Sequence, residues 1–131
     1  MARRWLVDGM NLIGSRPTGW WRDRGAAMRK LVAELDRFAD ATGDEVTVVF
    51  DGRPGDDRPP PGGRRRGRLW VAFAPGGRDA ADDQIVERVA RLGDPSAVRV
   101  VTSDKGLVER IRSSGVEVVP AGRFRRLLDE N

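Results

Sequence analysis

Residues Trp5-Leu6-Val7-Asp8-Gly9-Met10-Asn11 are the most informative part of the sequence. They form a short apolar run that ends in a carboxylate, a glycine and an amide, which is the pattern of a buried strand leading into a loop. In open parallel α/β sheets, ligands bind at the carboxyl ends of the strands. Asp8 and Asn11 therefore fall where a functional site is expected, and the same pattern recurs further along the chain.

The rest of the chain alternates strand and helix patterns. Apolar and β-branched runs predict strands at residues 4–8, 46–50, 69–74, 98–102 and 116–119. Apolar positions spaced three and four residues apart predict helices over residues 24–41, 80–92 and 123–130. A further helix is predicted to follow Ser103-Asp104 and to run up to Gly115. Asp23 is a candidate cap for the first of these helices, and Gly43 a candidate end. The alternation predicts a three-layer α/β fold, with a five-stranded parallel sheet between helices on both faces and right-handed crossovers.

Two connecting segments are rich in glycine and proline. Residues 9–21 are predicted to be a connection without regular structure. Residues 52–68 contain a triple proline, several glycines and a run of arginines, a composition that cannot bury apolar surface, so we expect a mobile loop. Because no repeat or domain boundary occurs, residues 1–131 are predicted to form one domain.

Composition limits the chemistry of any site. The 131 residues include no cysteine and no histidine, which excludes disulfides and thiolate or imidazole ligands. Any catalytic metal must therefore be held by oxygen. The apolar run before Asp8 is too short for a signal-peptide core or a membrane span, so we expect a cytoplasmic protein with no membrane partner.

Positive charge and aromatic residues favour nucleic acid as the partner. The formal net charge is +4, the isoelectric point is about 10.8, and nearly all the positive charge is arginine, which suits phosphate geometry. Genomic base composition is an alternative explanation of the same arginine usage. Candidate substrate-binding residues are Trp20, Trp21, Arg64, Arg65, Arg66, Arg68 and Lys105. The tryptophans could stack on unpaired bases or cover a core edge, and the arginines could contact phosphates or form a solvated turn.

Carboxylates end or follow four of the segments that reach the carboxyl edge of the predicted sheet. They are Asp8, Asp51, Asp104 and the group Asp79, Asp82 and Asp83. Two carboxylates about 5 Å apart at an effective dielectric constant near 20 repel by roughly 3 kcal/mol, so their convergence requires raised pKa values or a cation. Mg²⁺ or Mn²⁺ suits oxygen ligands and can activate water for phosphodiester hydrolysis. The pattern therefore predicts a metal-dependent nuclease site.

Several of these residues also have a local structural interpretation. Asp79 and Asp82 have the spacing of a capping box at the start of a helix. Ser103 could be the N-cap of the helix after it, while Asp51 and Asn11 could each close a local turn. For Asp82, capping does not explain the other acids on the same edge.

Four motifs carry a more specific signal, and they occur in a fixed order. They are Asp8-Gly9-Met10-Asn11, Val49-Phe50-Asp51, Asp79-Ala80-Ala81-Asp82-Asp83 and Val101-Thr102-Ser103-Asp104. Over nearly the whole chain, this arrangement resembles the NYN domain, a PIN-like nuclease fold, and most of all its YacP-like bacterial branch. The resemblance implies the strand order 3-2-1-4-5 and a metal-dependent endoribonuclease. For the YacP-like branch it also implies cleavage of ribosome-associated mRNA.

The resemblance also implies roles for single residues. The metal would be bound, directly or through water, by Asp8, Asp82 and Asp104, with Asp83 in support. Asn11 would orient a metal-bound water or the phosphate, and Ser103 would position the carboxylate of Asp104. Asp51 is a further candidate at the rim of the cluster.

The alternative function is a catalytically weak or inactive RNA- or ribosome-binding module of the same fold. Some NYN nucleases have a further acid one turn after the residue matching Asp104, where this chain has Val108. Two other classes fit poorly. An aspartyl-phosphate phosphatase requires a second aspartate where Met10 stands, and neither a dinucleotide-binding glycine motif nor a P-loop occurs.

Overall fold

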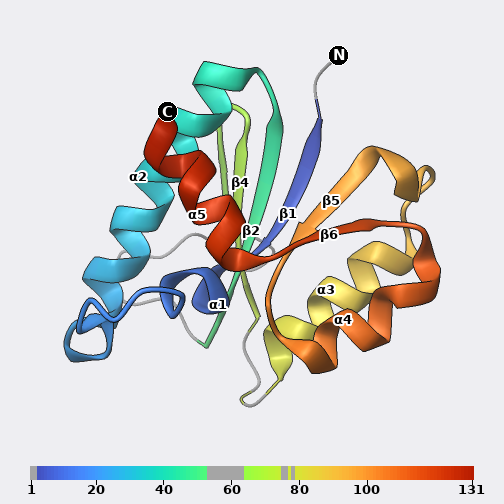
Figure 1. Cartoon of the computed structure of the whole chain (residues 1–131), viewed down its shortest axis with the longest axis horizontal. Coiled ribbons are helices and arrows are strands. Elements are labelled where there is room, and N and C mark those ends of the chain that lie inside the picture. The colour runs from blue at the N-terminus through green and yellow to red at the C-terminus, as the bar shows by residue number, and fades with distance from the viewer. Residues whose placement is uncertain (1–2, 53–63, 75–76, 78) are drawn as a thin grey trace.

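The structure, a computed structural model, describes residues 3–52, 64–74, 77 and 79–131 (Figure 1). A single sheet has the strand order β3-β4-β2-β1-β5-β6. Its strands are β1 (Arg4–Asp8), β2 (Glu45–Asp51), β3 (Arg64–Arg66), β4 (Leu69–Ala74), β5 (Val98–Val101) and β6 (Glu117–Val119). All pairs are parallel except β3 with β4. The five parallel strands have the order 3-2-1-4-5 in chain order, which confirms the predicted α/β sheet.

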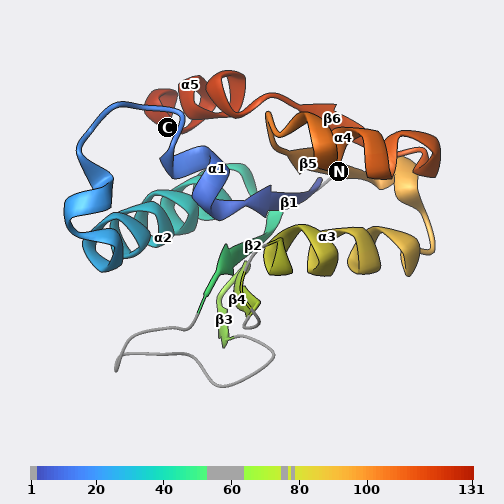
Figure 2. The same ribbon diagram turned by 90° about the horizontal axis from the view of Figure 1, so that it is seen from below.

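Helices cover both faces of this sheet. They are α1 (Gly9–Ile13), α2 (Arg24–Thr42), α3 (Ala80–Ala90), α4 (Lys105–Ile111) and α5 (Ala121–Glu130), with 3-10 turns η1 (Trp20–Arg22), η2 (Pro95–Ala97) and η3 (Arg112–Ser114). Figure 2 shows α1, α2 and α5 on one side of the sheet and α3 and α4 on the other. The three predicted layers are therefore present. Within the described residues, none of the helices has the length and apolar character needed to cross a bilayer.

The central strand β1 supplies both halves of the core, because successive side chains of a strand point to opposite faces. Trp5 and Val7 pack with α2 and α5, where Trp5 contacts the rings of Phe38 and Phe124. Leu6 packs on the other side with α3 and α4. Asp8 follows this alternation and points toward the α3 side.

Two predicted connections contain short regular elements. The segment 9–21 includes α1, which begins directly after β1, and η1. Both elements are too short to show a helical period in the sequence. The predicted loop 52–68 also ends early, because residues 64–66 form an antiparallel edge strand against β4. Residues 53–63 lie outside the described residues.

Gly9 allows α1 to begin where it does. A Cβ atom at this position would lie 2.5 Å from Cδ1 of Phe50 and 3.0 Å from Cγ2 of Val48. Only a residue without a side chain therefore lets the turn after β1 lie directly against β2. This close approach places Asp8 and Asn11 on either side of the glycine, at the carboxyl edge of the sheet.

The ends of α2 agree with the sequence prediction. Asp23 accepts a hydrogen bond from the backbone N–H of Ala26 at 2.9 Å, as an N-cap does. Gly43 ends the helix in the left-handed conformation, with φ of 76°. These caps fix how far α2 extends and therefore where η1 lies beside the carboxyl edge.

Candidate active site

Asp8 is the most buried acid of the site. It ends β1, is 4% exposed, and its Oδ2 accepts a hydrogen bond from Oγ1 of Thr102 at 2.9 Å. Burial is the main reason why the pKa of Asp8 rises from 3.8 to about 6. The carboxylates of Asp82 and Asp51 contribute to this rise, while the hydrogen bonds from Thr102 and from the backbone of Asn11 oppose it.

Thr102 links two of the predicted acids, although the sequence analysis gave it no role. Its side chain is buried, and its Oγ1 donates to Asp8 and accepts from the backbone N–H of Asp104 at 3.1 Å. One hydroxyl group therefore sets the spacing between β1 and the start of α4. Its position directly after β5 could have indicated this role in the sequence, because a residue there lies at the same edge of the sheet as Asp8.

Asp104, and not Ser103, is the N-cap of α4. Its Oδ1 accepts from the backbone N–H groups of Gly106 at 2.9 Å and Leu107 at 3.2 Å. The N-cap prediction for Ser103 is therefore wrong. The Ser103 hydroxyl oxygen instead accepts from the backbone N–H of Ala121 at 2.8 Å, which ties the start of α5 to this edge.

Asn11 holds the loop between β5 and α4. Its Oδ1 accepts a hydrogen bond from the backbone N–H of Ser103 at 2.8 Å. The amide therefore connects α1 to the segment that carries Thr102 and Asp104. This contact gives Asn11 a positioning function within the protein, beside the role toward water or phosphate that the sequence predicts.

Asp51, at the end of β2, caps helix α3, which follows β4 in the chain. Its Oδ1 accepts from the backbone N–H of Ala81 at 3.1 Å. Asp79 occupies the N-cap position but makes no capping bond with its side chain and has a left-handed φ of 63°. The predicted capping box of Asp79 and Asp82 is therefore wrong. Asp51 replaces Asp79 as the cap, and the carboxylate of Asp82 stays out of the backbone contacts of its helix.

Asp82 is the acid of α3 that interacts electrostatically with the other acids of this edge. The pKa of Asp82 rises to about 6, mainly through burial and also through the carboxylates of Asp104, Asp51 and Asp79, while Arg110 opposes the rise. Asp83 points elsewhere and forms an ion pair with Arg110 of α4 at 2.8 Å. Asp82 therefore belongs to the acidic edge, whereas Asp83 links the two helices on this face.

The acids interact electrostatically, but within the described residues they do not form a complete metal-binding site. Across residues 3–52, 64–74, 77 and 79–131, no three acidic side chains lie close enough together to hold one metal ion by themselves. Carboxylate oxygens are nevertheless the ligands that Mg²⁺ and Mn²⁺ prefer, and Mg²⁺ commonly keeps several waters and takes one or two carboxylates. The donor chemistry of Asp8 and Asp82 therefore fits a partly hydrated divalent ion.

The predicted substrate-binding residues have different surroundings. Trp20 is half-buried against the core, whereas Trp21 is 61% exposed. The two rings pack edge-on, with their centroids 6.1 Å apart. Lys105 is exposed at the start of α4, and Arg68 is exposed just before β4. The side chains of residues 64–66 lie outside the described part of the structure.

A hollow of about 450 Å³ adjoins the acidic edge. Its lining includes Trp20, Asp51, Asp79 and Arg24. Arg24 donates a hydrogen bond from Nη2 to the backbone carbonyl oxygen of Asp51 at 2.8 Å. A cation and an aromatic ring therefore border the acids on the side of η1.

A parallel sheet of this order, with acids at its carboxyl edge, defines a nuclease-like α/β domain of the PIN-like type. The profile of the YacP-like NYN domain matches residues 5–131, and the chain belongs to this family. The resemblance found in the four sequence motifs is thereby confirmed.

Solved structures agree with this assignment. The chain is similar to the W164L mutant of Rae1 (YacP) from Bacillus subtilis, with a TM-score of 0.78 and 25% identity over 99% of this chain and 76% of that one. Another structure of Rae1 (YacP) from Bacillus subtilis has a TM-score of 0.74 and 23% identity over 96% of this chain and 73% of that one. No curated protein sequence matches the chain.

Proposed function

We propose that this protein is a metal-dependent endoribonuclease that hydrolyses phosphodiester bonds of single-stranded RNA. The observation that carries the proposal is the convergence of acids from separate segments: burial first, and then the repulsion of neighbouring carboxylates, raises the pKa of both Asp8 and Asp82 to about 6. Such mutual repulsion is costly unless a cation relieves it. Membership of a family with a nuclease-like fold supports the same conclusion.

Asp8 and Asp82, with Asp104 close by, are the residues that would hold Mg²⁺ or Mn²⁺. When bound, this ion would supply charge neutralisation at the phosphate and a water of lowered pKa. The other residues position these acids. Thr102 orients Asp8 and the backbone of Asp104, and Asp51 fixes the start of the helix that carries Asp82.

The test is cleavage of a fluorescent single-stranded RNA library by the full chain with EDTA, Mg²⁺ or Mn²⁺. Asp8→Asn and Asp82→Asn should each lower the cleavage rate at least about 100-fold, because each removes a charge from the ion site. Asp40→Asn, an exposed acid on α2, is the matched control and should cleave like the wild type. Cleavage that survives in Asp8→Asn would refute the assignment.

A second candidate is an RNA- or ribosome-binding module that keeps the fold without turnover. It is favoured by the lack of a three-carboxylate cage among the described residues and by Val108 on α4. In this case the wild type would bind RNA in a salt-dependent way and never cut it with Mn²⁺. Binding to ribosomes purified from bacteria, compared with binding to free RNA, would then identify the partner.

A further inference from the structure

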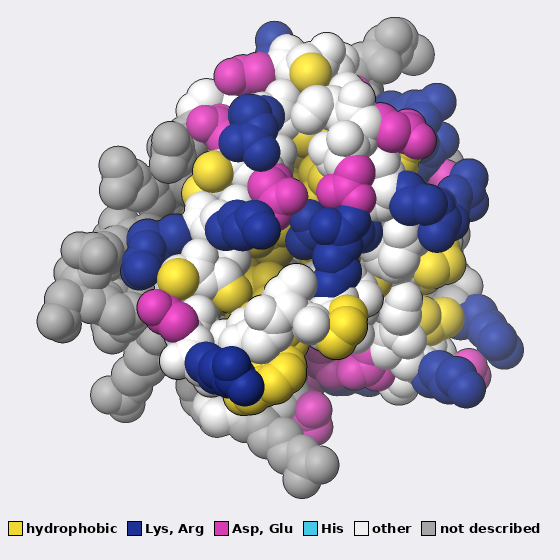
Figure 3. Space-filling model, turned by 60° about the vertical axis from the view of Figure 1, so that its left-hand side comes forward, with side chains coloured by type: hydrophobic (Ala, Val, Ile, Leu, Met, Phe, Trp, Pro, Cys, Tyr) yellow, Lys and Arg dark blue, Asp and Glu magenta, His cyan; other side chains and the backbone are white. Residues whose placement is uncertain are grey.

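A second hollow lies on the α2 side of the sheet, where no function has been assigned. It has a volume of about 300 Å³ and lies between the segment after α1, η1, α2 and α5. Its lining includes four cationic side chains, Arg16, Arg22, Lys30 and Arg125, against the two acids Asp23 and Glu34. Figure 3 shows this side of the molecule, with hydrophobic atoms inside a hollow and Lys and Arg side chains around it.

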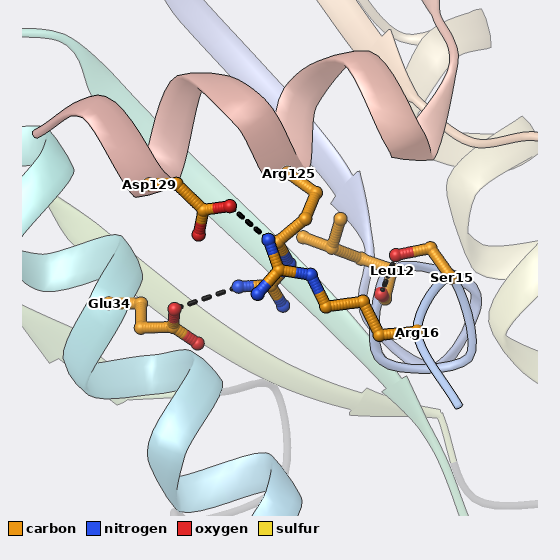
Figure 4. A network of polar contacts seen from close by, with 6 residues as sticks. All are labelled: Leu12, Ser15, Arg16, Glu34, Arg125 and Asp129. Carbon is orange, nitrogen blue, oxygen red and sulfur yellow. Dashed lines mark hydrogen bonds and ion pairs between the residues drawn. The ribbon is translucent and has the colours of Figure 1, made fainter. Parts of the chain in front are cut away.

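A buried ion pair forms one wall of this pocket. Arg125 of α5 is only 9% exposed, and its Nη1 donates to Oε2 of Glu34 at 2.7 Å. Its buried Nε has no hydrogen-bond partner among the described residues. Arg16 enters the same space from the segment after α1 and pairs with Asp129 (Figure 4). Glu34 and Asp129 therefore neutralise these two arginines and hold their guanidinium groups in place.

The two remaining cations of the pocket outnumber its remaining acid, Asp23. Arg22 and Lys30 are exposed side chains of its lining, and neither has an ion-pair partner in the described parts of the chain. Asp23 uses a carboxylate oxygen to cap α2. Asp23 keeps its negative charge while it caps the helix, so the four cations exceed Asp23, Glu34 and Asp129 by one positive charge, which favours an anionic ligand such as a phosphate group.

Trp20 adds an aromatic surface and connects this pocket to the acidic edge. The residue lines both the cationic pocket and the hollow that contains Asp51 and Asp79. The pocket also contains the apolar side chains of Ile13 and Leu31. An aromatic and apolar wall beside cations suits a flat base attached to a phosphate, and the volume is at the lower end of the range for small-ligand sites.

We propose that this pocket binds one nucleotide, with its base against Trp20 and its phosphate at Arg22 and Lys30. The nucleotide is either free or part of an RNA strand that continues past Trp20 to the acidic edge. The second form rests on the proposed function, whereas the first does not.

The experiment measures binding of adenosine 5′-monophosphate, adenosine and a six-nucleotide single-stranded RNA to the full chain in EDTA, where metal-dependent cleavage is blocked. Lys30→Glu should weaken binding of the phosphorylated probe about tenfold, because it replaces a charge-assisted contact with repulsion. Arg29→Glu is the control, since it makes the same charge change on the neighbouring residue of α2, which does not line the pocket. Arg22→Glu changes the charge of a second pocket residue, on η1, and should weaken binding in the same way.

If Lys30→Glu and Arg22→Glu weaken probe binding and Arg29→Glu does not, the result supports nucleotide binding in the pocket. The probe that is affected identifies the source of the nucleotide. An effect on the monophosphate shows a free-nucleotide site, and an effect on the RNA alone shows a strand site. Equal effects of Lys30→Glu and Arg29→Glu, or no effect of either, would overturn the proposal. Cleavage of RNA by the wild type with Mn²⁺ is measured separately, so failure of the nuclease assignment is distinguished from failure of the pocket.

Discussion

Replacing Asp8 with asparagine should stabilise the metal-free protein near neutral pH while removing the proposed activity. In the native structure this carboxylate is buried at the end of β1 and faces the charges of Asp82 and Asp51. An amide of nearly the same shape keeps an oxygen that accepts from Thr102. The substitution therefore removes a negative charge from a site that disfavours it and leaves the packing in place.

The size of the effect follows from the pKa of Asp8, which lies at about 6 in the folded protein against 3.8 for an unperturbed group. A shift of roughly two units corresponds to about 3 kcal/mol. The folded pKa is raised, so the native state holds the proton more tightly and the wild type loses stability as the pH rises from about 4 to above 6. Asparagine does not titrate. The variant should thus gain about 1–3 kcal/mol of unfolding free energy at pH 8 and little at pH 4.

The assay is urea unfolding in EDTA from pH 4 to pH 8, followed by tryptophan fluorescence. The advantage of Asp8→Asn over the wild type should grow between about pH 4 and pH 6 and stay constant above about pH 7. Asp40→Asn is measured in parallel as the exposed control. Added Mg²⁺ should stabilise the wild type and not the variant, because ligand binding to the folded state adds to its stability. An advantage that is independent of pH, or a variant less stable than the wild type at pH 8, would show that the charge of Asp8 does not destabilise the folded protein.

Three further substitutions test the parts that position the site. Gly9→Ala should lower the free energy of unfolding by about 1–3 kcal/mol, measured by urea unfolding, because its Cβ would overlap Phe50; unchanged stability would show that α1 can move away. Thr102→Val should cost about 1–3 kcal/mol and slow RNA cleavage, since a buried carboxylate loses its donor; cleavage at the wild-type rate would contradict this role. Glu34→Gln should cost about 3–5 kcal/mol by leaving Arg125 buried without its counter-charge, and replacing both residues with Leu and Met should restore most of the thermal stability.

The sequence was a reliable guide where a periodic pattern runs over several residues. The buried strands and the long helix α2 follow from apolar periodicity and from its caps, Asp23 and Gly43. Short elements were missed for a physical reason. A single turn such as α1 has no period to detect, and the edge strand at residues 64–66 depends on pairing with β4, which is a contact between segments.

Local capping rules failed at the site because partners came from distant segments. Ser103 and Asp79 each had the right type and place for an N-cap, yet Asp104 and Asp51 take those hydrogen bonds. Asp51 precedes Ala81 by thirty positions in the chain, a separation across which capping patterns carry no information. Thr102 was overlooked because its function lies in a hydrogen bond to Asp8, which is far away in sequence.

The sequence by itself determined the layered α/β fold, the order of the acids along the chain and the oxygen-only chemistry of any metal site. These follow from periodicity and composition, which are local properties. The three-dimensional arrangement was needed to learn which acids interact electrostatically, which serve as caps or ion pairs, and that Trp20 lines both an acidic hollow and a cationic pocket. The reason is that burial and charge interaction depend on distances across the fold, and those distances are set when the crossovers bring β1, β2 and β5 side by side.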